Sequence, residues 1–211
     1  MEIKWILVDD GSDLGINTQD TERIAREIKN FEAIFLDKNF GKGYAVRKGM
    51  QNVQAETYLY TDIDFPYRNE DLVGMYERSC AAGDLLLASR NEQYYENVAR
   101  GRTLISKLFK RAIRFLFNIP TTDTQAGLKV LSQAAKDLLL QTRVNRYLFD
   151  LELVKLSAKN GLKIIEYPVK LKDNVTLSKV SYRVLVTEFL NLFRILFRWG
   201  FGSDLTHPYF C

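Results

Sequence analysis

Short apolar runs alternate with amphipathic stretches along most of this 211-residue chain, and this alternation restricts the fold more than any other feature. We predict strands at residues 3–8, 33–36, 57–61, 84–89, 127–131 and 163–171. Helical periodicity falls at residues 18–29, 42–53, 70–82, 102–117, 133–141, 148–159 and 182–199. Strands that alternate with helices favour an α/β fold with a largely parallel sheet. Ligands in such folds bind beyond the carboxyl ends of the strands.

Two acidic residues stand at the predicted carboxyl end of the third strand. The segment 58–66 reads Tyr-Leu-Tyr-Thr-Asp-Ile-Asp-Phe-Pro and ends the strand with Asp62 and Asp64. Alternate side chains of an extended chain point to the same side, so both carboxylates can face one ligand. Carboxylate oxygens suit Mg²⁺ or Mn²⁺, which proteins often share with a substrate diphosphate. The alternative for an isolated Asp-x-Asp is a solvated turn.

Two other strands also end in polar turns. The first is followed by Asp9, Asp10 and Gly11, which offer carboxylates to a polar ligand, although Asp-Gly-Ser is also a common turn. After the second strand, the glycine-rich segment 39–49 places Lys42 at the predicted start of a helix. Backbone N–H groups at a positive helix end form a ready anion site. The segment lacks the Walker A spacing, so on its own it is a weak signal.

Composition limits the other classes of function. The length suits one domain with a real core, and the net charge is +4. Two cysteines indicate no disulfide framework and fit a reducing compartment. His207 is the only histidine, which argues against histidine-based catalysis or a zinc site. With neither a signal peptide at the start nor an uncharged apolar run of about 18 residues, we expect a cytoplasmic protein.

The predicted helix at 102–117 is basic on one face and apolar on the other. Six positive residues and no acid lie between Arg100 and Arg114. A basic amphipathic helix indicates peripheral binding to a membrane surface, here the inner face, and cover of the sheet is the alternative. The helix at 182–199 has a wide apolar face that fits either role. Nucleic-acid binding is disfavoured, because the positive residues are not interleaved with stacking aromatics on a sheet face.

Several blocks, taken in order, carry a family resemblance. They are Val8 to Ser12, Asn39 to Gly49, Thr61 to Asp64, Ser89-Arg90, Arg102 to Ser106, Asp123 to Lys129, Phe149 to Leu153 and Ile165 to Val169. Together they resemble the family 2 glycosyltransferases of GT-A fold, in particular the polyprenyl and dolichyl phosphate glucosyl- and mannosyltransferases. The resemblance implies a three-layer α/β sandwich with a mostly parallel sheet over residues 1–175. An amphipathic helix and tail, expected to associate with the membrane, would occupy residues 176–211.

The resemblance also implies roles for individual residues. Asp10 would bind the nucleobase, while Asp62 and Asp64 would bind the metal and the ribose and diphosphate of the nucleotide. Arg90 would lie near the sugar diphosphate and Arg102 near the acceptor phosphate. The remaining candidates for substrate binding are Lys42, Ser106, Asp123, Gln125 and Lys179. The candidate catalytic residues are Asp64, Arg90 and Asp150.

The implied reaction is inverting transfer of a hexose from a nucleotide sugar, with UDP-glucose the expected donor, to a polyprenyl phosphate. A lipid monophosphate is already largely ionised near neutral pH, because its second pKa is about 6, and it needs no general base. A sugar or glycolipid hydroxyl, as in capsule or lipopolysaccharide assembly, would need one, and Asp150 or Asp123 would be the candidate. For Asp150 and Glu152 a solvated or capping role is the alternative. A non-catalytic nucleotide-sugar-binding remnant is the third hypothesis.

One departure from the family pattern concerns the first strand. The family begins with another strand and helix, which carry a Pro-x-Tyr-Asn-Glu-like segment that contacts the nucleobase. This chain starts at the family's second strand, so we expect a unit of roughly 30 or more residues to be missing from inside the sheet. Its absence would leave unpaired backbone groups and a packing gap. Three explanations are open: a misplaced or truncated start, a strand supplied by another chain, or a decayed relative.

Overall fold

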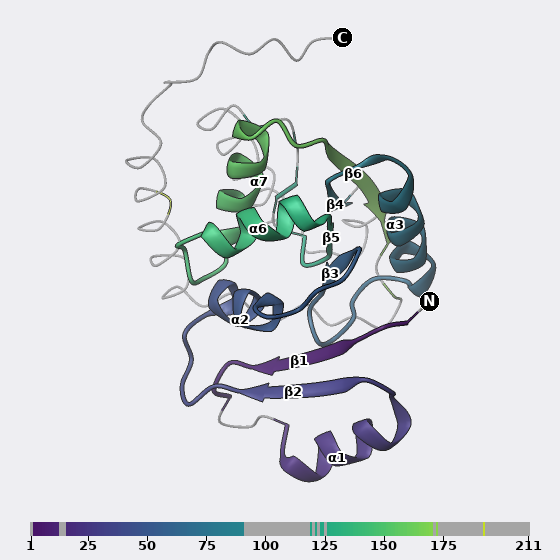
Figure 1. The fold of residues 1–211 in the computed structure, drawn as a ribbon, viewed down its shortest axis with the longest axis vertical. Coiled ribbons are helices and arrows are strands. Elements are labelled where there is room, and N and C mark those ends of the chain that lie inside the picture. Colours follow the sequence, from purple (N-terminus) through teal and green to yellow (C-terminus); the bar gives the residue numbers. More distant parts are fainter. Residues whose placement is uncertain are drawn as a thin grey trace, which may run out of the picture.

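The structure is a computed structural model that describes residues 2–12, 16–90, 119, 121, 123–124, 126–170, 172 and 192 (Figure 1). Its strands are β1 (Trp5–Asp9), β2 (Phe31–Phe35), β3 (Tyr58–Tyr60), β4 (Leu85–Arg90), β5 (Lys129–Leu131) and β6 (Ile164–Val169). Its helices are α1 (Thr18–Glu27), α2 (Lys42–Met50), α3 (Asn69–Ala82), α6 (Gln133–Gln141) and α7 (Phe149–Lys159). Each lies where the sequence predicts it. The predicted helix at 102–117 and nearly all of 182–199 fall outside the described residues.

The strands form two sheets. Strands β1 and β2 pair in parallel, while the larger sheet has the order β3-β5-β4-β6. Within it, β4 and β6 are parallel, and β5 runs antiparallel to both β3 and β4. The prediction of a largely parallel sheet is therefore confirmed, with β5 as the exception. A buried run of three residues carries no signal of strand direction, so the sequence could not reveal this exception.

No ladder joins β1 to β3 among the residues that the structure describes. Helix α2 spans the break: it packs on β1 and also on α6. Close packing on β1 occurs at Gly49, where an added Cβ would lie 3.0 Å from Cγ2 of Val8.

Alternation along β4 builds a core on each face of the larger sheet. Leu85 and Leu87 join a cluster with the inner faces of α6 and α7, whereas Leu86 and Ala88 join one with Met75 of α3. All five side chains are fully buried. Helices on both faces of a sheet give three layers, as predicted. Leu192, from the predicted last helix, is also buried in the first cluster, so this position contributes to the core.

Helix starts follow the local sequence at two of three notable places. Ser132 precedes α6 and its hydroxyl oxygen accepts the N–H of Ala135, as serine commonly does at a helix start. Asn17 caps α1 in a reciprocal capping box. Asn69 has the side chain of a helix cap, but Arg68 holds the cap position and Asn69 is the first residue of α3. The first turn of α3 contains the acids Glu70 and Asp71, and Asp71 accepts the N–H of Lys170.

The tight packing of α2 yields a stability prediction. A Cβ at Gly43 would lie 2.6 Å from the carbonyl oxygen of Val144 and 2.7 Å from Cβ of Phe149. Alanine gains about 1 kcal/mol of helix propensity over glycine, but overpacking costs about 1–3 kcal/mol. We expect Gly43→Ala to lower the melting temperature by about 2–6 °C in a thermal melt followed by circular dichroism.

Gly49→Ala is the matched control, because Gly49 lies in the same helix and an added Cβ there would meet only the ends of the Val8 and Ile6 side chains, not backbone. Its melting temperature should stay within about 2 °C of the wild type. Equal effects at the two glycines would contradict the close approach of α2 to the loop before α7.

Candidate functional site

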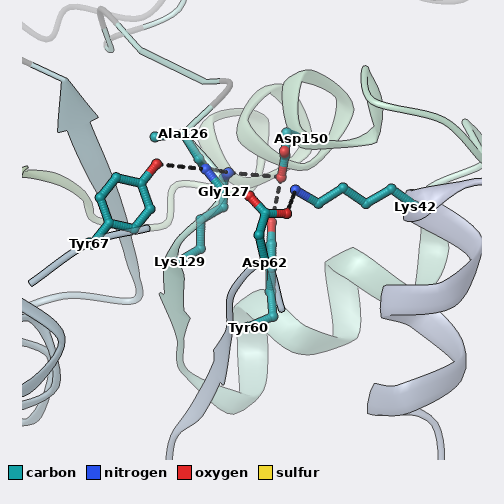
Figure 2. A network of polar contacts seen from close by, with 8 residues as sticks. All are labelled: Lys42, Tyr60, Asp62, Tyr67, Ala126, Gly127, Lys129 and Asp150. Carbon is teal, nitrogen blue, oxygen red and sulfur yellow. Dashed lines mark hydrogen bonds and ion pairs between the residues drawn. The ribbon is translucent and has the colours of Figure 1, made fainter. Parts of the chain in front are cut away.

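Lys42 and Asp62 meet at the carboxyl edge of the sheet (Figure 2). Lys42 is the first residue of α2, and Asp62 follows the last residue of β3 by two positions. Helices of α/β units run antiparallel to the strands they connect, so a helix start lies beside strand carboxyl ends. The Nζ of Lys42 lies 2.5 Å from Oδ1 of Asp62, and the two side chains are 23% and 39% exposed. The pair is thus accessible to a ligand at this edge.

The other oxygen of Asp62 lies against the backbone of Gly127. A Cβ at this glycine would overlap Oδ2 of Asp62, so only glycine allows the carboxylate to sit there. Gly127 is held in turn by its N–H, which donates to Oη of Tyr67 at 3.2 Å. The carboxylate therefore has a fixed orientation, with Oδ2 toward Gly127 and Oδ1 toward Lys42 (Figure 2).

A second ion pair lies beside the first and is almost fully buried. The Nζ of Lys129, on β5, lies 2.8 Å from Oδ1 of Asp150, on α7, and the side chains are 1% and 4% exposed. Tyr60, on β3, donates its hydroxyl to the same oxygen at 2.5 Å. Lys129 also donates to the carbonyl of Ala126 at 2.7 Å. These contacts offset the cost of removing two charges from water. A single buried charge without a partner would be strongly destabilising.

The two pairs interact electrostatically. Burial alone would lower the pKa of Lys42, but the carboxylates of Asp150 and Asp62 outweigh it and hold this pKa above its ordinary value. Lys42 is therefore a cation at neutral pH. Burial lowers the pKa of Lys129, and the charge of Asp150 opposes this effect. Burial and the charge of Asp150 together raise the pKa of Tyr60 well above its ordinary value. Two lysines and two aspartates thus form one charged cluster.

The geometry of the Asp-x-Asp segment differs from the prediction. Strand β3 ends at Tyr60, and the N–H of Phe65 donates to the carbonyl of Asp62 at 3.0 Å, closing a turn. The extended alternation that we used to place Asp62 and Asp64 on one side is therefore wrong, because hydrogen bonding within the turn replaces the strand. Asp64 is exposed in this turn, whereas Asp62 is partly buried.

Asp10 holds the glycine-rich turn before α2. Its two carboxylate oxygens accept the N–H groups of Phe40 and Gly41, at 2.8 Å each. The turn also needs Gly41 itself, whose φ of +105° is costly for other residues. Asp10 thus fixes the position from which Lys42 reaches Asp62. Its role toward a nucleobase stays a prediction.

Asp150 and Glu152 are not solvated. They are 3% and 1% exposed, which rules out the solvated alternative for both. Oε2 of Glu152 accepts the N–H groups of Arg143 and Val144, so this residue holds the loop between α6 and α7. The sequence did not reveal this burial, because both acids lie in the first turn of α7, where exposed acids are common.

The other predicted residues are placed only in part. Arg90 ends β4 opposite Val169 of β6, and its side chain is outside the description. Asp123 is fully buried, and its charge acts on Lys129. Outside the described residues lie Arg102, Ser106, Gln125 and Lys179.

The sequence analysis did not single out three residues that the structure places in the site. Gly127 and Lys129 belong to a block that we quoted, and Tyr60 stands in the third predicted strand. A signal for one of them exists in hindsight: Lys129 is a charge within the otherwise apolar run Leu128 to Leu131, and a lysine buried in a sheet needs a carboxylate partner.

The residues present suit a divalent cation shared with a ligand. The described segments contain no group of three or more His, Cys, Asp or Glu side chains that could hold a metal alone. Asp62 and Asp64 would supply hard oxygen ligands, and Mg²⁺ or Mn²⁺ commonly takes its other ligands from a diphosphate and water. Among the described helices, none has the length and apolar character needed to cross a bilayer.

Curated relatives are distant. The chain is 24% identical over 168 residues to the glycosyltransferase AglD of Haloferax volcanii, covering 78% of this chain and 27% of AglD. It is 25% identical to the dolichyl-phosphate beta-glucosyltransferase of Saccharomyces cerevisiae, covering 79% of this chain and 56% of that protein. The human enzyme of the same name is 29% identical, with 78% and 54% covered. The chain thus spans a quarter to just over half of these relatives.

Solved structures share the fold. Mannosyl-3-phosphoglycerate synthase from Rubrobacter xylanophilus aligns with a TM-score of 0.65 at 15% identity, over 99% of this chain and 68% of the other. Glucosyl-3-phosphoglycerate synthase from Mycobacterium tuberculosis, in complex with Mn²⁺ and UDP-glucose, aligns with a TM-score of 0.62 at 16% identity, over 94% and 69%. These likenesses confirm the predicted GT-A fold.

The family assignment rests on the amino-acid sequence itself. The model described as glycosyl transferase family 2 matches residues 1–139, which is more than half of the chain. The matched span includes Asp10, Lys42, Asp62, Gly127 and Lys129. This chain therefore belongs to glycosyl transferase family 2.

Proposed function

We propose that the protein transfers a hexose from a nucleoside diphosphate sugar, with UDP-glucose as the donor, to a polyprenyl phosphate, with inversion at the anomeric carbon. The observation that carries this proposal is the Lys42–Asp62 pair at the carboxyl edge of the sheet, where α2 begins. The similarity to dolichyl-phosphate beta-glucosyltransferases supports both the hexose and the lipid phosphate.

On the donor side, the site gathers the groups that a diphosphate needs. Asp62 and Asp64 would hold a divalent cation, which when bound neutralises the charge that develops on the leaving diphosphate. Lys42 adds a full positive charge at the start of α2, which is the positive end of the helix. Asp10 keeps this helix start in place through Phe40 and Gly41. A solved neighbour that contains Mn²⁺ and UDP-glucose supports this choice of metal and donor.

On the acceptor side, the buried acids favour a phosphate over a hydroxyl. A phosphate monoester is already ionised and needs no base, whereas a hydroxyl must lose its proton during attack. Asp150 is a poor base in this position, because one of its oxygens already accepts from Lys129 and Tyr60 and the side chain is almost fully buried. Asp123 is fully buried as well. We therefore assign Asp150 to positioning Lys42 and Lys129, and Arg102 to the acceptor phosphate.

One prediction of the proposed function concerns the metal. Asp64 is exposed, so Asp64→Asn should leave the melting temperature unchanged. The substitution replaces a negatively charged carboxylate of the proposed metal site by a neutral amide. In calorimetric titrations with UDP-glucose and Mn²⁺, we expect the variant to lose affinity at least about tenfold, which is 1.4 kcal/mol. Asp137→Asn removes an exposed carboxylate from α6 and is the matched control. Unchanged binding in Asp64→Asn would remove Asp64 from the metal site.

The second prediction separates the two acceptors. Removing Asp150 alone would leave Lys129 as an uncompensated buried charge, at a cost of about 3–5 kcal/mol. The variant Asp150→Asn with Lys129→Met removes both charges and keeps similar side-chain shapes. In transfer of labelled glucose to polyprenyl phosphate, we expect it to keep at least about a tenth of the turnover, whereas a lost general base would cost about 100-fold or more.

Arg102→Ala is the companion variant in the same assay and should lose most of the turnover. The opposite result would be a folded but inactive Asp150→Asn/Lys129→Met variant together with an active Arg102→Ala variant. It would indicate general-base activation of a sugar or glycolipid hydroxyl. That function would place the protein in capsule or lipopolysaccharide assembly.

The third prediction concerns the membrane. We propose that residues 102–117 bind anionic lipid at the inner face of the membrane, since a lipid acceptor must reach the site from a bilayer. In liposome flotation, binding should weaken as salt rises, because salt screens exposed charges. Replacement of Lys107, Lys110, Arg111 and Arg114 by glutamine should release the protein. If neither salt nor these substitutions changed the binding, residues 102–117 would not be the membrane-binding segment, and their role would be to cover the sheet.

A further inference from the structure

Lys42 occupies the oxygen of Asp62 that the surrounding backbone leaves open. Oδ2 of Asp62 is packed against Gly127, so Oδ1 is the oxygen that faces the carboxyl edge of the sheet. Oδ1 accepts from Nζ of Lys42 at 2.5 Å. An ammonium group and a divalent cation on one carboxylate oxygen would repel each other strongly at this distance. A metal can therefore bind Asp62 well only when the ammonium group moves away.

The side chain of Lys42 is able to make this move without a change of fold. Its backbone is fixed as the first residue of α2, while its side chain is 23% exposed on a flexible four-carbon stem. A diphosphate that binds at the start of α2 would lie next to the same residue. Besides Asp62, the charge of Asp150 already acts on this ammonium group. A bound nucleotide would add a further anionic partner, its diphosphate, beside the start of α2.

Charge balance gives the same result. A divalent cation adds two positive charges to the site, and the diphosphate of a nucleotide sugar adds two negative charges. The two ligands together leave the charge of the site unchanged, while either alone shifts it by two. The neighbouring Lys129–Asp150 pair is almost fully buried, so water screens such a shift poorly. Entry of both ligands together is therefore favoured over entry of the metal alone.

We propose that Lys42 is a resident counter-ion of the donor site. It neutralises Asp62 while the metal is absent, and it passes to the diphosphate when metal and nucleotide enter together. This inference rests on the proposed donor site and adds a property to it: Lys42 couples the binding of the metal to the binding of the nucleotide and keeps the affinity for free metal low.

The test measures Mn²⁺ binding without any nucleotide, by electron paramagnetic resonance of the free ion. Lys42→Met removes the charge and keeps most of the stem, so we expect the variant to bind Mn²⁺ about tenfold more tightly than the wild type. Lys42→Arg keeps the charge and should bind Mn²⁺ as weakly as the wild type. Lys48→Met removes an exposed positive charge from the same helix, away from Asp62, and should have no effect. Thermal melts establish that all variants are folded.

A second titration measures the coupling and the location of the bound ion. In the wild type, Mn²⁺ should raise the affinity for UDP, and in Lys42→Met this enhancement should fall about tenfold, because the diphosphate loses its ammonium partner. Addition of Asp62→Asn to Lys42→Met should abolish the gain in Mn²⁺ affinity.

Two results would overturn the role of Lys42. One is Mn²⁺ binding by Lys42→Met that is no tighter than that of the wild type, including the case in which neither binds. The other is a gain in Mn²⁺ affinity that survives Asp62→Asn. Failure of the proposed donor site has a different signature, namely a wild-type protein whose UDP affinity does not respond to Mn²⁺.

Discussion

The buried contact between Lys129 and Asp150 supports the arrangement of the whole site. It joins β5 to α7, and Tyr60 of β3 donates to the same carboxylate oxygen, so one acidic group ties three elements together. A buried charge without a partner is strongly destabilising. The core around β4 can therefore close only when these elements adopt the relative positions that complete the pair. The same positions place Gly127 under Asp62 and bring Asp150 close enough to raise the pKa of Lys42.

Function at this edge depends on how closely backbones approach each other. Gly43 lets α2 contact the loop that follows α6 and the first residue of α7, and Gly127 lets Asp62 lie on the turn before β5. Glu152 and Arg47 hold that loop from opposite sides, through the N–H of Val144 and its carbonyl oxygen. The exposed charges of the site thus stand on a rigid base, which lowers the cost of binding a charged ligand.

Much of the fold could be predicted because the elements have strong periodicity. The ends of α6 agree with the prediction to the residue, and Ser132 has the chemistry of a helix cap. Lys42 and Asp62 could also be predicted to approach one site, since helix starts and strand ends share an edge in α/β folds. Their direct contact could not, because it depends on where Gly127 and Asp10 place the two backbones, and both are distant in sequence.

The failures have physical causes as well. The turn at Asp62 replaces the extended chain because its own backbone hydrogen bond closes there. Asp150 and Glu152 resemble surface acids of a helix start, and only tertiary packing makes them buried anchors. The direction of β5 depends on its pairing partners, β3 and β4, which local sequence does not specify.

The central claim is that the meeting point of α2 and β3 binds the diphosphate of a nucleotide together with a divalent cation. A crystal structure of the protein with UDP and Mn²⁺, with anomalous diffraction used to locate the manganese, tests this most directly. The account predicts manganese bound by Asp62 and Asp64, and a diphosphate at the start of α2 in contact with Nζ of Lys42. Manganese bound at other residues, or a diphosphate away from α2 with Lys42 still paired to Asp62, would contradict it.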